Sequence, residues 1–144
     1  QYNGTAWTEA GDLNTARTGH AASGIVTAAL AFGGDDTPRA LTEAYNGTSW
    51  TEVNDLNTGR GSLGGVGTQT SSLAFGGSPP NTVNTESWDG TSWTEVNNLA
   101  TARRLIGGTG ANSTAAQSCG GSPNTATTEE FTAPDVIIKT VTDS

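Results

Sequence analysis

The chain has 144 residues, enough for one ordinary domain, and its 14 acidic and six basic residues give a formal net charge of -8. Nucleic acid and anionic membrane surfaces are excluded as partners, because the scattered basic side chains form no patch that could contact phosphates. No apolar run is long enough for a membrane helix, and no signal peptide is visible.

A unit of 43 residues recurs three times over residues 1–131, and a different segment, 132–144, follows it. Repeats of 40 to 50 residues indicate an array of similar structural units, so they are read before any single element. Aromatic, tryptophan and arginine series keep the 43-residue step. Their members are Tyr2, Tyr45, Trp88 and Phe131; Trp7, Trp50 and Trp93; and Arg17, Arg60 and Arg103.

The first predicted element is a hairpin at the start of the chain, "QYNGTAWTEA". A tight Asn-Gly or Asp-Gly pair between alternating residues is the strongest short hairpin signal, because both residues tolerate positive φ. The same pattern follows Tyr45 and Trp88 in the later copies. Each copy therefore places its first aromatic and its tryptophan on two neighbouring outer strands.

Two further strands are predicted between one hairpin and the next. A glycine-rich segment comes first, at 16–24, 59–67 and 102–110, where small side chains allow close packing. An apolar strand ending in a glycine pair follows, as in "TQTSSLAFGG". With 20 glycines and scarcely any helical periodicity, the chain is predicted to be all-β, with four short antiparallel strands per copy.

The order of these features resembles the kelch repeat: an apolar strand ending in Gly-Gly, then an aromatic, a tryptophan and an arginine. The resemblance implies kelch-like β-propeller blades over residues 1–131. More narrowly, "YNGTSWTEVNDLNT" together with "LAFGG" is similar to kelch-like repeats in predicted virion proteins of marine tailed phages. That similarity implies a location in the virion, on the particle surface or tail, or otherwise an extracellular one.

The phase of the repeat divides one predicted blade between the two ends of the chain. Its outer strand carries Trp7, and its other three strands lie between Arg103 and Phe131. Three blades are too few for a closed propeller. We expect a homodimer of six blades, in which the Trp7 strand of one chain completes the last sheet of the other. The alternatives are a longer parent chain, suggested by the absence of methionine, and a nine-bladed trimer or stacked assembly.

The recurring side chains are the candidate ligand or inter-blade contacts, and each series has two interpretations. The aromatic rings either pack between blades or offer stacking faces to sugars. The arginines either satisfy carbonyls and pair with a glutamate, or form a crown that binds a ligand. The candidates are Tyr2, Trp7, Tyr45, Trp50, Trp88 and Trp93, with Arg17, Arg60 and Arg103.

No catalytic, metal or cofactor site is predicted. His20 and Cys119 are the only histidine and cysteine, and they fall in different copies. Some kelch proteins are copper oxidases, but that chemistry needs tyrosine, cysteine and histidine residues that this sequence lacks. Cys119 takes the place of Phe32 and Phe75, so we expect a packed, half-buried thiol.

Together with the absence of a catalytic cluster, the resemblance implies a non-catalytic structural or adhesion module with no cofactor, acting as a protein- or receptor-binding platform in a phage virion. Its expected partners are itself or other virion proteins. The alternative function is a lectin-like propeller with one weak glycan site per blade, where repetition supplies avidity. The tail, 132–144, is expected to be a docking strand or an extra outer strand.

Overall fold

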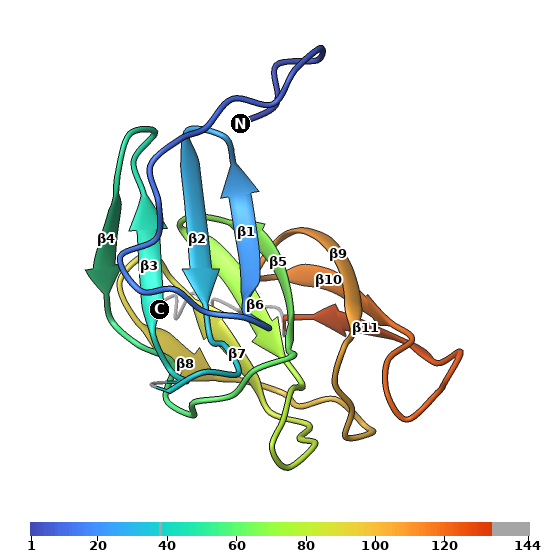
Figure 1. The fold of residues 1–144 in the computed structure, drawn as a ribbon. Helices are drawn as coiled ribbons and strands as arrows, with labels where there is room; N and C mark the ends of the chain where they lie inside the picture. Colours follow the sequence, from blue (N-terminus) through green and yellow to red (C-terminus); the bar gives the residue numbers. More distant parts are fainter. Residues whose placement is uncertain (38, 134–144) are drawn as a thin grey trace, which may run out of the picture.

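The computed structural model describes residues 1–37 and 39–133, which form eleven β-strands and no helix, so no helix there could cross a membrane (Figure 1). The predicted all-β fold of short antiparallel strands is confirmed. Sheet 1 contains β1 (Ala21–Ile25), β2 (Ala28–Phe32), β3 (Thr42–Tyr45) and β4 (Trp50–Val53). Sheet 2 contains β5 (Gly64–Thr68), β6 (Ser71–Phe75), β7 (Thr85–Trp88) and β8 (Trp93–Glu95). Sheet 3 contains β9 (Gly107–Asn112), β10 (Ala115–Cys119) and β11 (Thr128–Thr132).

Each of the first two sheets uses the strand order that the sequence predicts, with neighbouring strands joined in chain order. The first strands of the three sheets, β1, β5 and β9, lie side by side, and the later strands extend outward from them (Figure 1). The repeat therefore folds as three similar units arranged around one line of inner strands.

The glycine pair after the second strand is needed for its backbone conformation. Gly33 and Gly34 have φ values of 73° and 145°, where residues with a Cβ are strained. A Cβ on Gly33 would also lie 2.6 Å from the carbonyl oxygen of Arg60. The pair thus lets one sheet end where the next copy passes close to it.

The outer hairpins are held by a side-chain oxygen in the turn. Asn46 Oδ1 accepts the amides of Thr48 and Ser49 at 2.9 and 3.0 Å. Asp89 and Asn3 make the same pair of bonds in the other two copies. Asn and Asp are interchangeable here because the turn uses only the oxygen that they share.

Two apolar cores lie between the sheets, one at each junction. At the first junction, Phe32 of β2 lies against Gly65 of β5, where an added Cβ would come within 2.6 Å of the ring. At the second, Phe75 lies against Gly108 in the same way, at 2.7 Å. Each phenylalanine of one sheet therefore fills the space left by a glycine in the next sheet.

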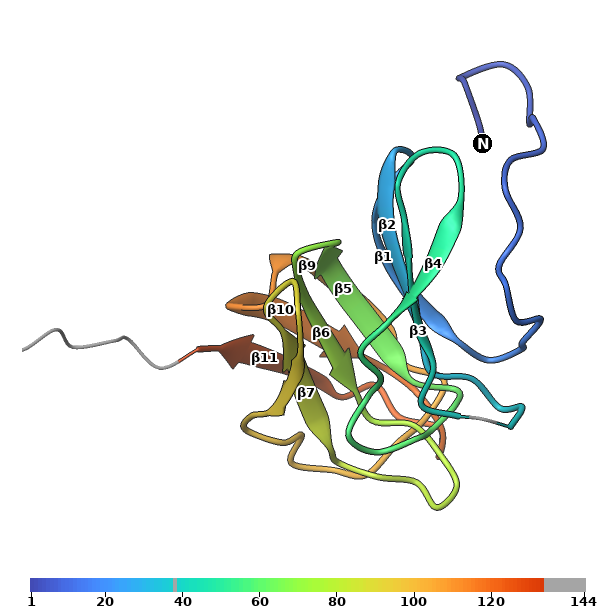
Figure 2. The ribbon, with the colours of Figure 1, turned by 90° about the vertical axis from the view of Figure 1, so that its left-hand side faces the viewer.

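The third sheet has three strands within the described residues, because the Trp7 strand does not join it. Trp7 forms a single antiparallel bridge with Tyr2 instead. Figure 2 shows this N-terminal segment and β11 on opposite sides of the molecule. One chain thus does not pair the two parts of the divided unit, and the expected strand in 132–144 lies outside the described residues apart from the end of β11 and Ala133.

Candidate functional site

The arginine series forms three equivalent ion pairs with the glutamates of the third strands. Arg17 Nη2 lies 2.5 Å from Glu43 Oε1, and Arg103 Nη2 lies 2.7 Å from Glu129 Oε1. Arg60 pairs with Glu86. All six side chains are buried except Glu129, which is 19% exposed. The arginines thus face the interior of their own copies and not the solvent.

All three nitrogens of the Arg60 guanidinium group donate hydrogen bonds within the protein. Its Nε donates to the carbonyl of Gly76 at 2.8 Å and its Nη2 to that of Ala74 at 3.2 Å. Its Nη1 donates to Thr58 O and to Glu86. Since Nε, Nη1 and Nη2 all donate to protein acceptors, Arg60 ties the strands of sheet 2 together.

The glutamates also connect consecutive copies. Glu86 accepts hydrogen bonds from the backbone and side-chain amides of Asn57, at 2.7 and 2.9 Å. The Asn57 side chain also donates to Trp93 O at 2.8 Å. Asn14 makes the equivalent contacts with Glu43 and Trp50 O. The recurring "LN" pair in the sequence is explained by this bridge to the following sheet.

The tryptophan of sheet 2 packs against sheet 1. The ring of Trp93 lies 4.9 Å from that of Phe32, and its Nε1 donates to Thr42 Oγ1 at 3.1 Å. Its other ring contact is Trp88, at 5.3 Å in its own sheet. Trp93 and Trp88 are 5% and 2% exposed, so both serve the core between sheets 1 and 2.

The aromatic residues of the first hairpin have the same local geometry but a different environment. The Tyr2 and Trp7 rings lie 5.2 Å apart, close to the 5.0 Å between Tyr45 and Trp50. Tyr45 is 5% exposed, whereas Tyr2 is 50% and Trp7 82% exposed. This hairpin therefore presents an aromatic pair that lacks the neighbouring sheet found beside the other two.

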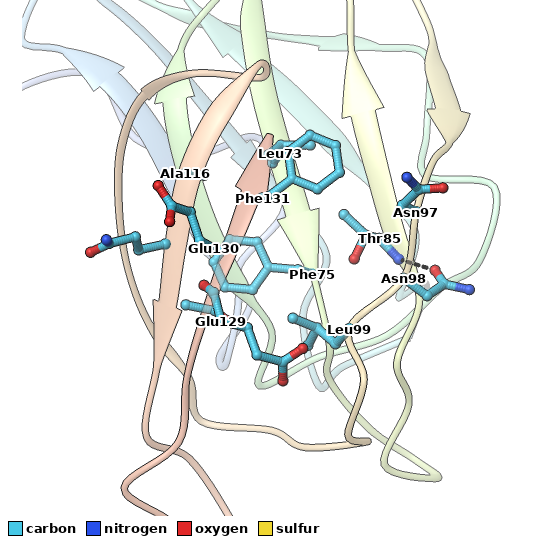
Figure 3. A pocket seen from close by; sticks show the side chains of 12 residues that line it. Leu73, Phe75, Thr85, Asn97, Asn98, Leu99, Ala116, Glu129, Glu130 and Phe131 are labelled. Carbon is cyan, nitrogen blue, oxygen red and sulfur yellow. Dashed lines mark hydrogen bonds between the residues drawn. The ribbon is translucent and has the colours of Figure 1, made fainter. Parts of the chain in front are cut away.

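An apolar pocket opens between sheets 2 and 3 (Figure 3). Leu73, Phe75 and Leu99 line one part of it, and Phe131 of β11 lines another. At its rim, Asn98 Oδ1 accepts the amide of Thr85 at 2.8 Å. Sequence reasoning missed this pocket, although it lies one repeat beyond Phe32 and Thr42, the residues that hold Trp93.

The remaining reactive side chains are isolated. Cys119 is exposed, so the expected packed thiol is wrong, because no further sheet of the described residues covers this end of β10. Desolvation and the nearby Arg17 guanidinium lower the pKa of His20. Hydrogen bonds from Thr18 lower the pKa of Asp36. Among residues 1–37 and 39–133, no three histidine, cysteine or acidic side chains are grouped so that they could bind a metal.

Comparison with known proteins does not assign the chain to a family. The chain matches no protein-family model and no curated protein at a significant level. What defines the molecule is therefore its fold, an all-β array of three antiparallel sheets, together with the repeated ion pairs and the open pocket.

Proposed function

We propose that this protein is a non-catalytic structural or adhesion module built from kelch-like propeller blades. The observation that carries the proposal is the threefold use of the arginine and glutamate series in buried ion pairs. The recurring arginines tie together the strands of each sheet, and the recurring glutamates also bind the segment that precedes each sheet. We infer that these repeated ion pairs make the three sheets a rigid frame.

Four-stranded antiparallel sheets with neighbouring inner strands support the propeller assignment. The kelch assignment rests on the order of the repeated residues. A propeller presents its connecting loops at the two ends of a stiff body, which suits a platform for other molecules.

The loops after the glycine pairs are the proposed contact surface. They connect the second and third strands of each sheet and differ between copies, with "DDTPRA", "SPPNTV" and "SPNTAT" in turn. The frame around them keeps the same residues. Variable loops on a constant frame are typical of a binding surface, and we propose a virion protein or a host receptor as the partner.

The virion role is tested by mass spectrometry of phage particles purified from the host lysate in which the gene is expressed. Peptides of the chain should copurify with infectious particles through a density gradient. A chain found only in the soluble fraction of the lysate would end this proposal. An antibody against the "SPPNTV" loop would then test exposure, since it should label intact particles.

The exposed pair of Tyr2 and Trp7 favours a second candidate, a lectin-like module. An aromatic face open to solvent can stack on a sugar ring, and a weak site gains avidity when many chains are displayed together. A glycan array probed with the chain on multivalent beads tests this function. Binding that disappears with Trp7→Ala would support it, and the absence of binding in multivalent display would count against it.

A further inference from the structure

Backbone hydrogen bonds link neighbouring sheets in two repeating series. In the first, Gly34 N donates to Arg60 O at 3.1 Å, and Gly77 N donates to Arg103 O at 2.9 Å. The next donor in this series is Gly121. It has no backbone acceptor within residues 1–37 and 39–133.

The second series runs along the inner ends of the sheets. Ser62 N donates to Gly19 O at 2.7 Å, and Leu105 N donates to Ser62 O at 2.6 Å. The carbonyl of Leu105 and the amide of Gly19 stay without backbone partners in the described part of the chain. Since the first series leaves the carbonyl of Arg17 similarly open, each end offers the groups that the other end requires.

The pocket between sheets 2 and 3 repeats the surroundings of Trp93. Trp93 contacts Phe32, Thr42 and Trp88. The residues 43 positions later are Phe75, Thr85 and Phe131, and all three line the pocket. The pocket therefore has the shape and chemistry of a site for the tryptophan of a fourth strand beside β11.

β11 extends past the position at which the third strands of the first two sheets end, as far as the described residues show. In the first two sheets the chain turns directly after Tyr45 and Trp88. After Phe131 it continues straight, because Thr132 pairs with Ala115 and Ala133 N donates to Thr114 O at 2.9 Å. The turn-forming Asn or Asp is also replaced, by Thr132.

The N-terminal segment carries the side chains that the missing strand needs. Besides the tryptophan, the strand needs a hydrogen-bond acceptor five residues later. In sheet 1, Asp55 accepts the amide of Thr42, the first residue of β3, and in sheet 2, Asn98 accepts the amide of Thr85, the first residue of β7. Trp7 and Asp12 occupy these positions in the first copy. The C-terminal segment has valine at both, 136 and 141.

We propose that the pocket binds Trp7 of a second copy of this chain. The Tyr2–Trp7 bridge opens, and Phe131 takes the place of Tyr2 beside the Trp7 strand. Asp12 then accepts the amide of Thr128. The inference stands apart from the virion role, because it uses only the two ends of the chain.

The exchange closes on itself in a dimer. Each chain has one Trp7 segment and one pocket, so a two-fold axis pairs the Trp7 segment of each chain with the pocket of the other. It also joins the open backbone groups, with Gly121 N donating to Arg17 O and Gly19 N to Leu105 O across the interface. The exchange breaks the Tyr2–Trp7 bridge and the backbone bonds from Asn3 N to Ala6 O and from Thr8 N to Gln1 O, and pairing with β11 replaces them.

The first test is the mass of the full chain in solution, by light scattering over a wide range of concentration. The native chain should have twice the chain mass of 14.6 kDa. Trp7→Ala and Asp12→Ala should shift it to the monomer mass. Ile25→Ala is the matched control, because Ile25 is also exposed but is the last residue of β1, and it should stay dimeric.

The second test fixes the register of the exchanged strand. Thr8 should lie opposite Glu130, as Thr51 lies opposite Ala44 and Thr94 opposite Ser87. Thr8→Cys and Glu130→Cys are made in separate Cys119→Ser chains, which are mixed and oxidised. A disulfide-linked dimer of the two variants is expected, since directly opposite residues are close enough to bridge. Ile25→Cys in place of Glu130→Cys should give none.

Three results would overturn the proposal. The first is a native chain that stays monomeric at every concentration. The second is a dimer that Trp7→Ala leaves intact but Val136→Asp dissociates, which would assign the pocket to the C-terminal segment. The third is a failure of the Thr8 and Glu130 cysteines to form a disulfide in a chain that is dimeric by mass.

Discussion

Removing the negative charge of Glu86 should destabilise the protein more than the equivalent change in the third copy, Glu129→Gln. Glu86 and its partner Arg60 are both 2% exposed, and water cannot replace the lost carboxylate. Glu86→Gln keeps the shape of the side chain but leaves a buried guanidinium group without its counterion. Breaking a buried ion pair in this way costs about 3–5 kcal/mol.

The matched comparison is Glu129→Gln in the third copy. Glu129 is 19% exposed, so water can approach Arg103 when the charge is removed. We expect a loss of about 1.5–3 kcal/mol, the range for hydrogen bonds to charged groups. The two variants change the same atoms in the same repeat position and differ chiefly in access to solvent.

Equilibrium unfolding in urea at one fixed protein concentration measures both effects. With an m-value of about 2 kcal/mol/M, the Glu86→Gln midpoint should fall by about 1.5–2.5 M. Replacing the whole pair, with Arg60→Met added to Glu86→Leu, should recover part of the loss. Equal losses for the Glu86 and Glu129 variants, or a loss below about 1 kcal/mol for Glu86→Gln, would refute the argument, since that is the range of exposed pairs.

Three further changes test other parts of the structure. Hydrogen bonds from Ser92 and Thr91 lower the pKa of Asp89. The contribution of Asp89 to stability is therefore present above the ordinary aspartate pKa of 3.8 and is lost as the pH falls through the lowered pKa. Asp89→Asn should remove this part of the acid dependence of the unfolding midpoint. Gly65→Ala should lower the free energy of unfolding in urea by about 1–3 kcal/mol, because its Cβ would lie 2.6 Å from the Phe32 ring. Gly107→Ala is the control and should cost less, because its Cβ would lie 3.1 Å from its nearest contact, Cys119 Sγ. Trp93→Ala should cost about 3–5 kcal/mol by the same measurement.

The repeat in the sequence was sufficient to predict the strands and their order. Hairpin signals beside Tyr45 and Trp88 and the glycine pairs fix where each sheet turns, and the structure has strands at these places. These are local properties, because a turn needs only its own few residues. Four strands per copy therefore follow for sheets 1 and 2 from the sequence alone.

The environment of the repeated side chains could not be predicted in the same way. Tyr2 and Tyr45 occupy one repeat position but are 50% and 5% exposed, and Trp7 differs from Trp93 still more. Burial depends on the sheet that lies next to each copy. For this reason the sequence gives no direct sign of the pocket beside Phe131 or of the exposed Cys119.

A large phenylalanine faces a glycine at each of the two inner junctions, and the residues at the same repeat positions in the outermost sheets differ in size from both. Where the inner junctions place Phe32 against Gly65 and Phe75 against Gly108, the ends carry Cys119 and Ala22 at those positions. A smaller residue on one side is matched by a larger one on the other. In the dimer proposed above, Cys119 of one chain would face Ala22 of its partner, and the small side chain of Cys119 would leave room there for a Cβ that Gly65 and Gly108 lack.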